Sequence, residues 1–113
     1  GVETTFQQDI KDRSEILNHL QKLLAKALKK LNEKDLTAQT LTIKIKYHDF
    51  VQITRSRTLA FSISESMDST PIFENLLKNT EIGQRKVRLL GVSLSSFNNH
   101  LQLLNYRQMD LFE

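Results

Sequence analysis

Hydrophobic and polar positions alternate or repeat in six successive segments of the chain. A weakly apolar alternation over residues 2–8 predicts a short strand at a sheet edge. Residues 14–34 repeat their apolar side chains every three to four positions, which is typical of an amphipathic helix. Asp12 or Ser14 is expected to cap its first turn. The apolar stripe of this helix comprises Ile16, Leu17, Leu20, Leu23, Leu24, Ala27, Leu28 and Leu31.

Two further alternating segments follow this helix. Residues 41–48 alternate cleanly, as a half-buried strand does. A tight turn at residues 48–50 leads into a third strand, expected over residues 51–63. Arg55 and Arg57 fall on the apolar parity of this strand, where burial of two charges is costly. We therefore expect the strand to bulge, twist or leave the sheet edge near these arginines.

A short helix and a last strand complete the pattern. Thr70 followed by Pro71 predicts a helix start, with Thr70 as the N-cap and Pro71 in the first helical position. The last strand is expected over residues 85–97. Its apolar positions change parity near Gly91, which predicts a bulge or sharp twist there. Periodicity is lost over residues 98–113, which we expect to form a flexible tail.

The order β-α-β-β-α-β predicts an α+β domain of the ferredoxin-like type. Such a domain is a four-stranded antiparallel sheet with both helices on one face. Residues 1–97 would form this single domain, which suits a chain of 113 residues. The other sheet face would be open and would carry Lys44, Lys46 and polar residues of the third and fourth strands.

Composition restricts the chemistry of the chain. The absence of Cys excludes disulfides and Cys-ligated zinc, and the net charge of +3 is compatible with a polyanionic partner. His19, His48 and His100 lie on different elements, and no Gly-rich phosphate loop is present. We therefore expect no metal site and no catalysis by this chain. No apolar run reaches membrane-spanning length and no signal peptide is visible, so a soluble cytoplasmic protein is expected. We also expect it to be a monomer.

Two cation-rich segments are candidate phosphate-binding sites. Residues 54–58 interleave hydroxyl and guanidinium groups, both of which hydrogen-bond to phosphate oxygens. Residues 85–88 place three cations within four positions. Each segment is also typical of an exposed strand edge protected by charge. The candidate residues are Lys44, Lys46, Thr54, Arg55, Ser56, Arg57, Thr58, Arg85, Lys86 and Arg88.

Other functions remain open from these patterns. The chain is also compatible with a protein-interaction module that binds through its sheet or tail and ignores nucleic acid. An RNA-recognition domain would need exposed aromatic residues on the central strands, and the candidates Tyr47 and Phe61 fall in core parity. The apolar residues near the C-terminus predict a partner-binding peptide. Its residues are Gln108, Met109, Asp110, Leu111 and Phe112.

Two internal motifs resemble a known family. Phe50 with Ile53–Leu59, followed later by Arg85–Leu94, is similar to the C-terminal little finger domain of Y-family translesion DNA polymerases. Within that family the chain most resembles the bacterial DNA polymerase IV group. Gly1–Phe6 with Asp9 is similar to the segment where the little finger begins. The resemblance implies that seven of the candidate residues contact the phosphates of primer–template duplex, namely Thr54, Arg55, Ser56, Arg57, Arg85, Lys86 and Arg88.

The C-terminal peptide extends the resemblance. Gln108–Phe112 is similar to the sliding-clamp-binding pentapeptide Gln-Leu-x-Leu-Phe, with Met109 as a volume-conserving replacement for Leu. This implies that the domain tethers a polymerase to the clamp's β subunit. Magnesium and the catalytic carboxylates would belong to a palm domain outside this chain, so the chain alone would be inactive. Leu89 and Ser93 are neutral where some relatives carry cations, which implies weaker binding of phosphates.

Overall fold

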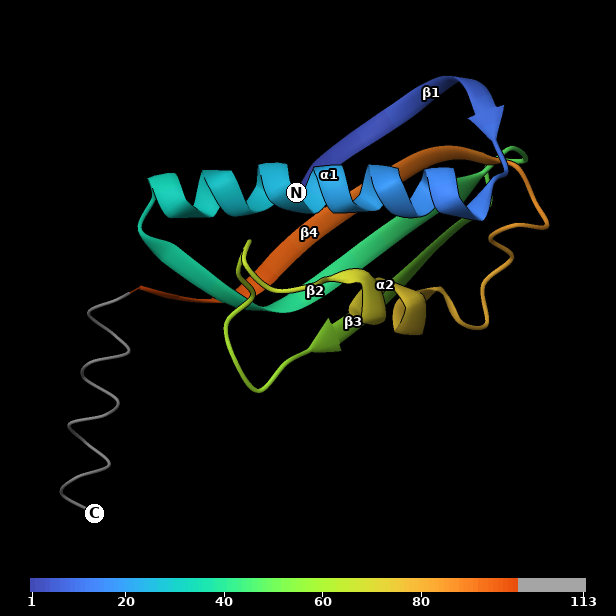
Figure 1. The fold of residues 1–113 in the computed structure, drawn as a ribbon. Coiled ribbons are helices and arrows are strands. Elements are labelled where there is room, and N and C mark those ends of the chain that lie inside the picture. The colour runs from blue at the N-terminus through green and yellow to red at the C-terminus, as the bar shows by residue number, and fades with distance from the viewer. Residues whose placement is uncertain (100–113) are drawn as a thin grey trace, which may run out of the picture.

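The computed structural model describes residues 1–99 and has the predicted β-α-β-β-α-β order (Figure 1). The elements are β1 (Val2–Ile10), α1 (Arg13–Glu33), β2 (Leu36–Tyr47), β3 (Gln52–Thr58), α2 (Thr70–Leu77) and β4 (Val87–Asn99). The strands form one sheet in the order β1-β4-β2-β3, and each neighbouring pair is antiparallel. Both helices lie on the same face of the sheet (Figure 1). The predicted α+β architecture is therefore confirmed.

The hydrophobic core fills the space between the helices and the covered sheet face. Ile16 and Leu20 of α1 pack there with Ile43 and Ile45 of β2, and all four side chains are fully buried. The helix begins after Asp12, whose carboxylate accepts a hydrogen bond from the Ser14 N–H at 3.3 Å. Of the two expected caps, Asp12 is therefore the one used.

All four strands differ in extent from the prediction. β1 runs to Ile10, and β2 begins at Leu36 instead of residue 41. β4 covers residues 87–99 instead of 85–97. The early part of β2 and the end of β4 pair with each other, with Leu36 opposite Asn99. These residues lack a clean apolar alternation, so their strand conformation depends on the ladder between them.

β3 ends at Thr58, and the prediction that it continues to Ile63 was wrong. The Ile63 N–H donates to the carbonyl oxygen of Ala38 at 2.8 Å from an irregular loop, and the Ile63 side chain is buried from there. Because the chain has left the ladder, strand parity no longer applies. Phe61, predicted to face the core, is 58% exposed.

α2 begins one residue before the prediction. Its N-cap is Ser69, and Thr70 is the first helical residue, so the assignment of Thr70 as N-cap was wrong. The Asp68 carboxylate accepts a hydrogen bond from the Thr70 N–H at 3.0 Å, which fixes the turn that leads into the helix. Pro71 follows within the first turn, where its missing N–H has no helical partner to lose.

The irregularity of β4 lies at Arg88. Val87 and Leu89 pair with the consecutive residues Tyr47 and Lys46 of β2, so Arg88 is the extra residue of a bulge. The parity change predicted from the sequence is real, but it occurs earlier in the strand than expected. Its position depends on the pairing with β2, which the sequence does not specify.

Candidate nucleic-acid interface

The uncovered face of the sheet carries rows of hydroxyl groups. Directly opposite residues of neighbouring strands share a face. One row comprises Ser93, Thr42 and Ser56, and the next comprises Ser95, Thr40 and Thr58. Thr42 hydrogen-bonds to Ser56 at 2.8 Å, and Thr40 to Thr58 at 2.9 Å. These bonds hold the hydroxyls of β2 and β3 together, and Ser93 and Ser95 extend the two rows onto β4.

Lys44 and Glu3 form an ion pair on the same face. The Lys44 ammonium donates to a Glu3 carboxylate oxygen at 2.5 Å. Gly91 lies opposite both residues in regular register, so the bulge predicted there was wrong. A Cβ at Gly91 would lie 3.1 Å from Glu3 Cγ and 3.4 Å from Lys44 Cβ. The glycine therefore leaves room for the pair, which partly neutralises Lys44.

Two cations and an aromatic ring meet at the turn end of the open face. The Lys46 ammonium lies 5.7 Å from the centroid of the Phe50 ring, and the Arg88 guanidinium lies 4.8 Å from it. Both distances are in the range of cation–π contact. The sequence indicated the cations but gave Phe50 no function of its own. The sequence feature that could have identified Phe50 is the presence of an apolar residue at the tip of a tight turn.

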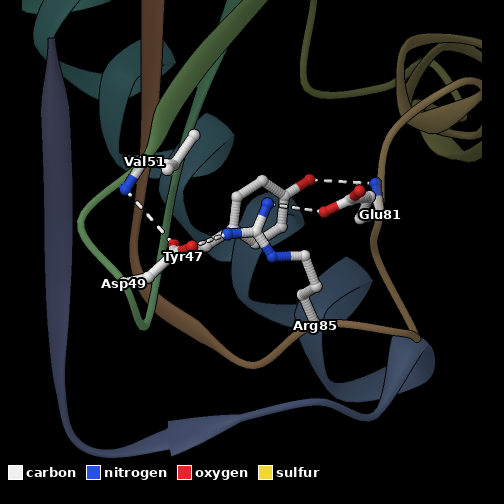
Figure 2. A network of polar contacts seen from close by, with 5 residues as sticks. All are labelled: Tyr47, Asp49, Val51, Glu81 and Arg85. Carbon is white, nitrogen blue, oxygen red and sulfur yellow. Dashed lines mark hydrogen bonds and ion pairs between the residues drawn. The ribbon is translucent and has the colours of Figure 1, made fainter.

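Arg85 lies in the loop before β4, and side chains of the β2–β3 turn and of the loop after α2 hold its guanidinium (Figure 2). Its guanidinium donates to the Glu81 carboxylate at 2.6 Å and pairs with the Asp49 carboxylate. The same group stacks on the Tyr47 ring at 4.4 Å, and the Tyr47 hydroxyl accepts a hydrogen bond from the Glu81 N–H at 2.9 Å. The Arg85 side chain is 27% exposed. This network joins the β2–β3 turn to the loop between α2 and β4.

The ionisation of the network follows from these contacts. Desolvation raises the pKa of Asp49, but the hydrogen bond from the Val51 N–H and the charge of Arg85 outweigh it. The pKa of Asp49 therefore lies below its ordinary value of 3.8. The hydrogen bond to Glu81 raises the pKa of Arg85 against an opposing effect of desolvation, and Asp49 raises it further. The positive charge of Arg85 is thus matched by two carboxylates.

The Thr54–Thr58 motif is divided between the two faces of the sheet. Arg55 and Arg57 lie opposite Ile43 and Leu41, whose side chains are fully buried, so both arginines start on the helix side. The pairing of β3 with β2 has a regular register, so the expected bulge is absent from this pairing. The third alternative, that the strand leaves the sheet near these arginines, is confirmed, because β3 is an edge strand that ends at Thr58, directly after Arg57. From the edge, long arginine side chains reach solvent past the apolar layer.

The fold brings the two cationic segments only partly together. β2 separates β3 from β4, so the segments are not adjacent strands. On the helix side, Arg55 and Arg85 line one pocket of about 220 Å³. Lys86 is exposed, and its carbonyl oxygen accepts a hydrogen bond from the His48 N–H at 2.9 Å. The open face and its turn end hold Lys44, Lys46, Thr54, Ser56, Thr58 and Arg88.

The predicted clamp peptide, Gln108–Phe112, lies outside the described residues, as does His100. Within residues 1–99, no group of three or more His, Cys, Asp or Glu side chains is placed to hold a metal ion. Neither of the two described helices is long and apolar enough to cross a membrane.

Comparison with known proteins assigns the family. The C-terminal domain of the impB/mucB/samB family matches residues 1–111. The chain belongs to this family. DNA polymerase IV of Clostridioides difficile is 37% identical over 114 residues, covering 100% of this chain and 31% of the relative. DNA polymerase IV of Halorhodospira halophila is 38% identical over 112 residues, covering 99% and 30%. The chain therefore spans about a third of the length of these relatives.

Two solved polymerase structures contain the same fold. The little finger domain of PolIV, solved in a complex with the beta-clamp processivity factor, matches with a TM-score of 0.60 and 28% identity. That match covers 83% of this chain and 84% of the other. The insertion ternary complex of Dbh DNA polymerase matches with a TM-score of 0.73 and 21% identity, over 88% of this chain and 28% of that one. The resemblance to the Y-family little finger is confirmed.

Proposed function

We propose that this little finger domain holds DNA for an error-prone translesion DNA polymerase IV in the cytoplasm. Its open face would bind the phosphates of primer–template duplex without reading the bases. The observation that carries the proposal is the composition of that face. Hydrogen-bonded hydroxyl rows lie beside Lys44, Lys46 and Arg88, and both kinds of group bind phosphate oxygens.

The structure changes which predicted residues support this function best. Lys44, Lys46, Thr54, Ser56, Thr58 and Arg88 share the open face or its turn end, and Lys86 lies in the adjoining loop. Arg55 and Arg57 start on the helix side of β3, so we do not count them among the phosphate contacts. Arg85 is engaged by Asp49 and Glu81, so we assign it to the support of the turn.

Polymerase chemistry belongs to the part of the protein outside this chain. We propose that magnesium is held there by the carboxylates of a palm domain and that the chain alone catalyses no nucleotide transfer. Since the chain spans about a third of its relatives, the remaining length is sufficient for such a domain. A primer-extension assay on the chain alone should give no product.

We propose that Gln108–Phe112 binds the sliding clamp. Support comes from its similarity to the clamp-binding pentapeptide and from the fold shared with a clamp-bound little finger. Replacing Leu111 and Phe112 together by Ala should abolish clamp binding and leave DNA binding intact. Unchanged affinity for the clamp would rule out this role of the peptide.

A salt titration of duplex binding tests the DNA-holding function. Each neutralised phosphate contributes about 0.9 to the slope of log affinity against log salt, so three open-face cations predict a slope of about 2.7 in magnitude. Two duplexes of unrelated sequence should bind equally. Salt-independent binding, or no binding, would instead favour a protein-interaction module. A clear preference for one duplex sequence would contradict recognition by phosphates alone.

A further inference from the structure

We infer that Phe50 is a positioning residue of the open face, whose ring holds the Lys46 and Arg88 side chains where they meet phosphates. The inference rests on the proposed DNA-holding function and adds to it a residue that the cationic motifs do not contain. Lys46 comes from β2 and Arg88 from the bulge of β4, so the ring joins side chains of two strands.

The conformation of Phe50 contributes little to the stability of the domain. The residue has a φ of 69°, in the left-handed region that bulky side chains rarely adopt. Its N–H closes the turn on the Tyr47 carbonyl oxygen at 2.9 Å, a bond that any residue except proline would make. The side chain is 60% exposed, so it gains little from burial. Backbone strain at an exposed residue that adds little to stability indicates that the residue is kept for a function.

The ring has a defined task in the free protein. Both cations lie within about 6 Å of its centroid, where the ring quadrupole attracts positive charge. Without the ring, two like charges at the same corner of the sheet would repel each other and sample many rotamers. Binding of phosphates would then have to restrict both long side chains. The ring removes part of that freedom beforehand, which favours association.

The surroundings favour a polyanion as the partner of this corner. The exposed residues Lys86 and His48 lie next to it, joined by a backbone hydrogen bond. Asp49, in the same turn, is paired with Arg85 (Figure 2), so its charge is already matched. The corner therefore presents cations around an apolar tip, the combination by which proteins contact phosphates and sugars of DNA.

Three variants test the role of the ring. Phe50→Leu removes the aromatic face and keeps apolar bulk, and should weaken duplex binding about fivefold at fixed salt. Phe50→Tyr restores the face and should bind as the unmodified chain does. The salt slope should not change in Phe50→Leu, because the same cations still neutralise phosphates. Phe61→Leu is a matched control, since Phe61 is similarly exposed but lies in the loop after β3.

A double-mutant cycle separates positioning from direct contact. If Phe50 acts through the two cations, Phe50→Leu should have no further effect once Lys46 and Arg88 are both replaced by Gln. Independent effects would overturn the inference. If Phe50→Leu does not fold, Phe50→Asn repeats the test, because asparagine adopts a positive φ more readily than leucine does.

A readout without DNA checks the geometry itself. Ring-current shifts of the Lys46 and Arg88 side-chain protons should appear in the free protein and disappear in Phe50→Leu. Their absence would overturn the inference. Equal duplex binding by the unmodified chain and Phe50→Leu would also overturn it, while the proposed function stands. Failure of the unmodified chain to bind duplex would overturn the proposed function and this inference together.

Discussion

Arg85 and Arg88 are three residues apart and look equivalent in the sequence, but their surroundings differ. Arg85 is paired with Asp49 and Glu81, whereas Arg88 lies on the Phe50 ring at the open face. We therefore predict that Arg88→Gln weakens the electrostatic binding of DNA and that Arg85→Gln weakens the fold at the turn. Arg57, exposed at the β3 edge on the other face, is the matched control.

The expected size of the effect follows from the number of open-face cations. With Lys44, Lys46 and Arg88 each neutralising one phosphate, the slope is about 2.7, which means about a 40-fold loss of affinity between 50 and 200 mM salt. Arg88→Gln reduces the slope to about 1.8 and this loss to about 12-fold. Arg85→Gln should keep the original slope and lower the melting temperature, because two carboxylates lose their shared partner.

Fluorescence anisotropy with a labelled duplex at four or more salt concentrations measures the slopes, and thermal unfolding of the same samples measures stability. Arg57→Gln should change neither quantity appreciably. The reasoning fails if Arg85→Gln lowers the slope as much as Arg88→Gln does. It also fails if Arg88→Gln leaves the slope unchanged.

Three further predictions follow from single contacts. Glu3→Gln removes the carboxylate that competes with phosphate for Lys44 and should tighten duplex binding by about 1.5- to 5-fold while the salt slope stays at about 2.7; weaker binding would contradict the competition between carboxylate and phosphate. Ionised Asp49 stabilises the fold above its unfolded pKa of 3.8, and this contribution is lost as the pH falls through the lower pKa of the folded state. The stability difference between the unmodified chain and Asp49→Asn should therefore shrink in urea unfolding between pH 7 and pH 3, and a constant difference would refute this. Leu20→Ala empties a fully buried position and should lower the free energy of unfolding by about 2–5 kcal/mol, whereas a loss below about 1 kcal/mol would contradict its place in the core.

The sequence correctly predicted a helix or a strand wherever buried side chains recur at a regular period. The stripe of α1 and the alternation of β2 each determine which side chains are buried, whatever the neighbouring strands do. The prediction was wrong where burial comes from an irregular chain. Ile63 is buried from a loop, and Phe61 beside it is exposed, although both share the parity of a strand.

The sequence predicted which residue types form the candidate interface, and the tertiary structure decided on which face of the sheet each residue lies. The sequence supplied the cations, the hydroxyls and the family of the chain. It placed Arg55 and Arg57 with the neighbouring hydroxyls, yet strand alternation puts them on opposite faces once β3 pairs with β2. Arg85 and Arg88 are indistinguishable as candidate phosphate contacts in the sequence. They differ in the structure because Arg85 is paired with Glu81 of its own loop and with Asp49 of a turn distant in the chain.

The amino-acid sequence by itself thus determined the order of elements, the apolar face of each one and the basic character of the open face. These properties depend on local periodicity and composition. Only the tertiary structure decided the strand order, the place of the β4 bulge and the charges that remain free for DNA. Register and ion pairing depend on which segments meet in space, so a one-residue shift at Arg88 changes what the open face presents.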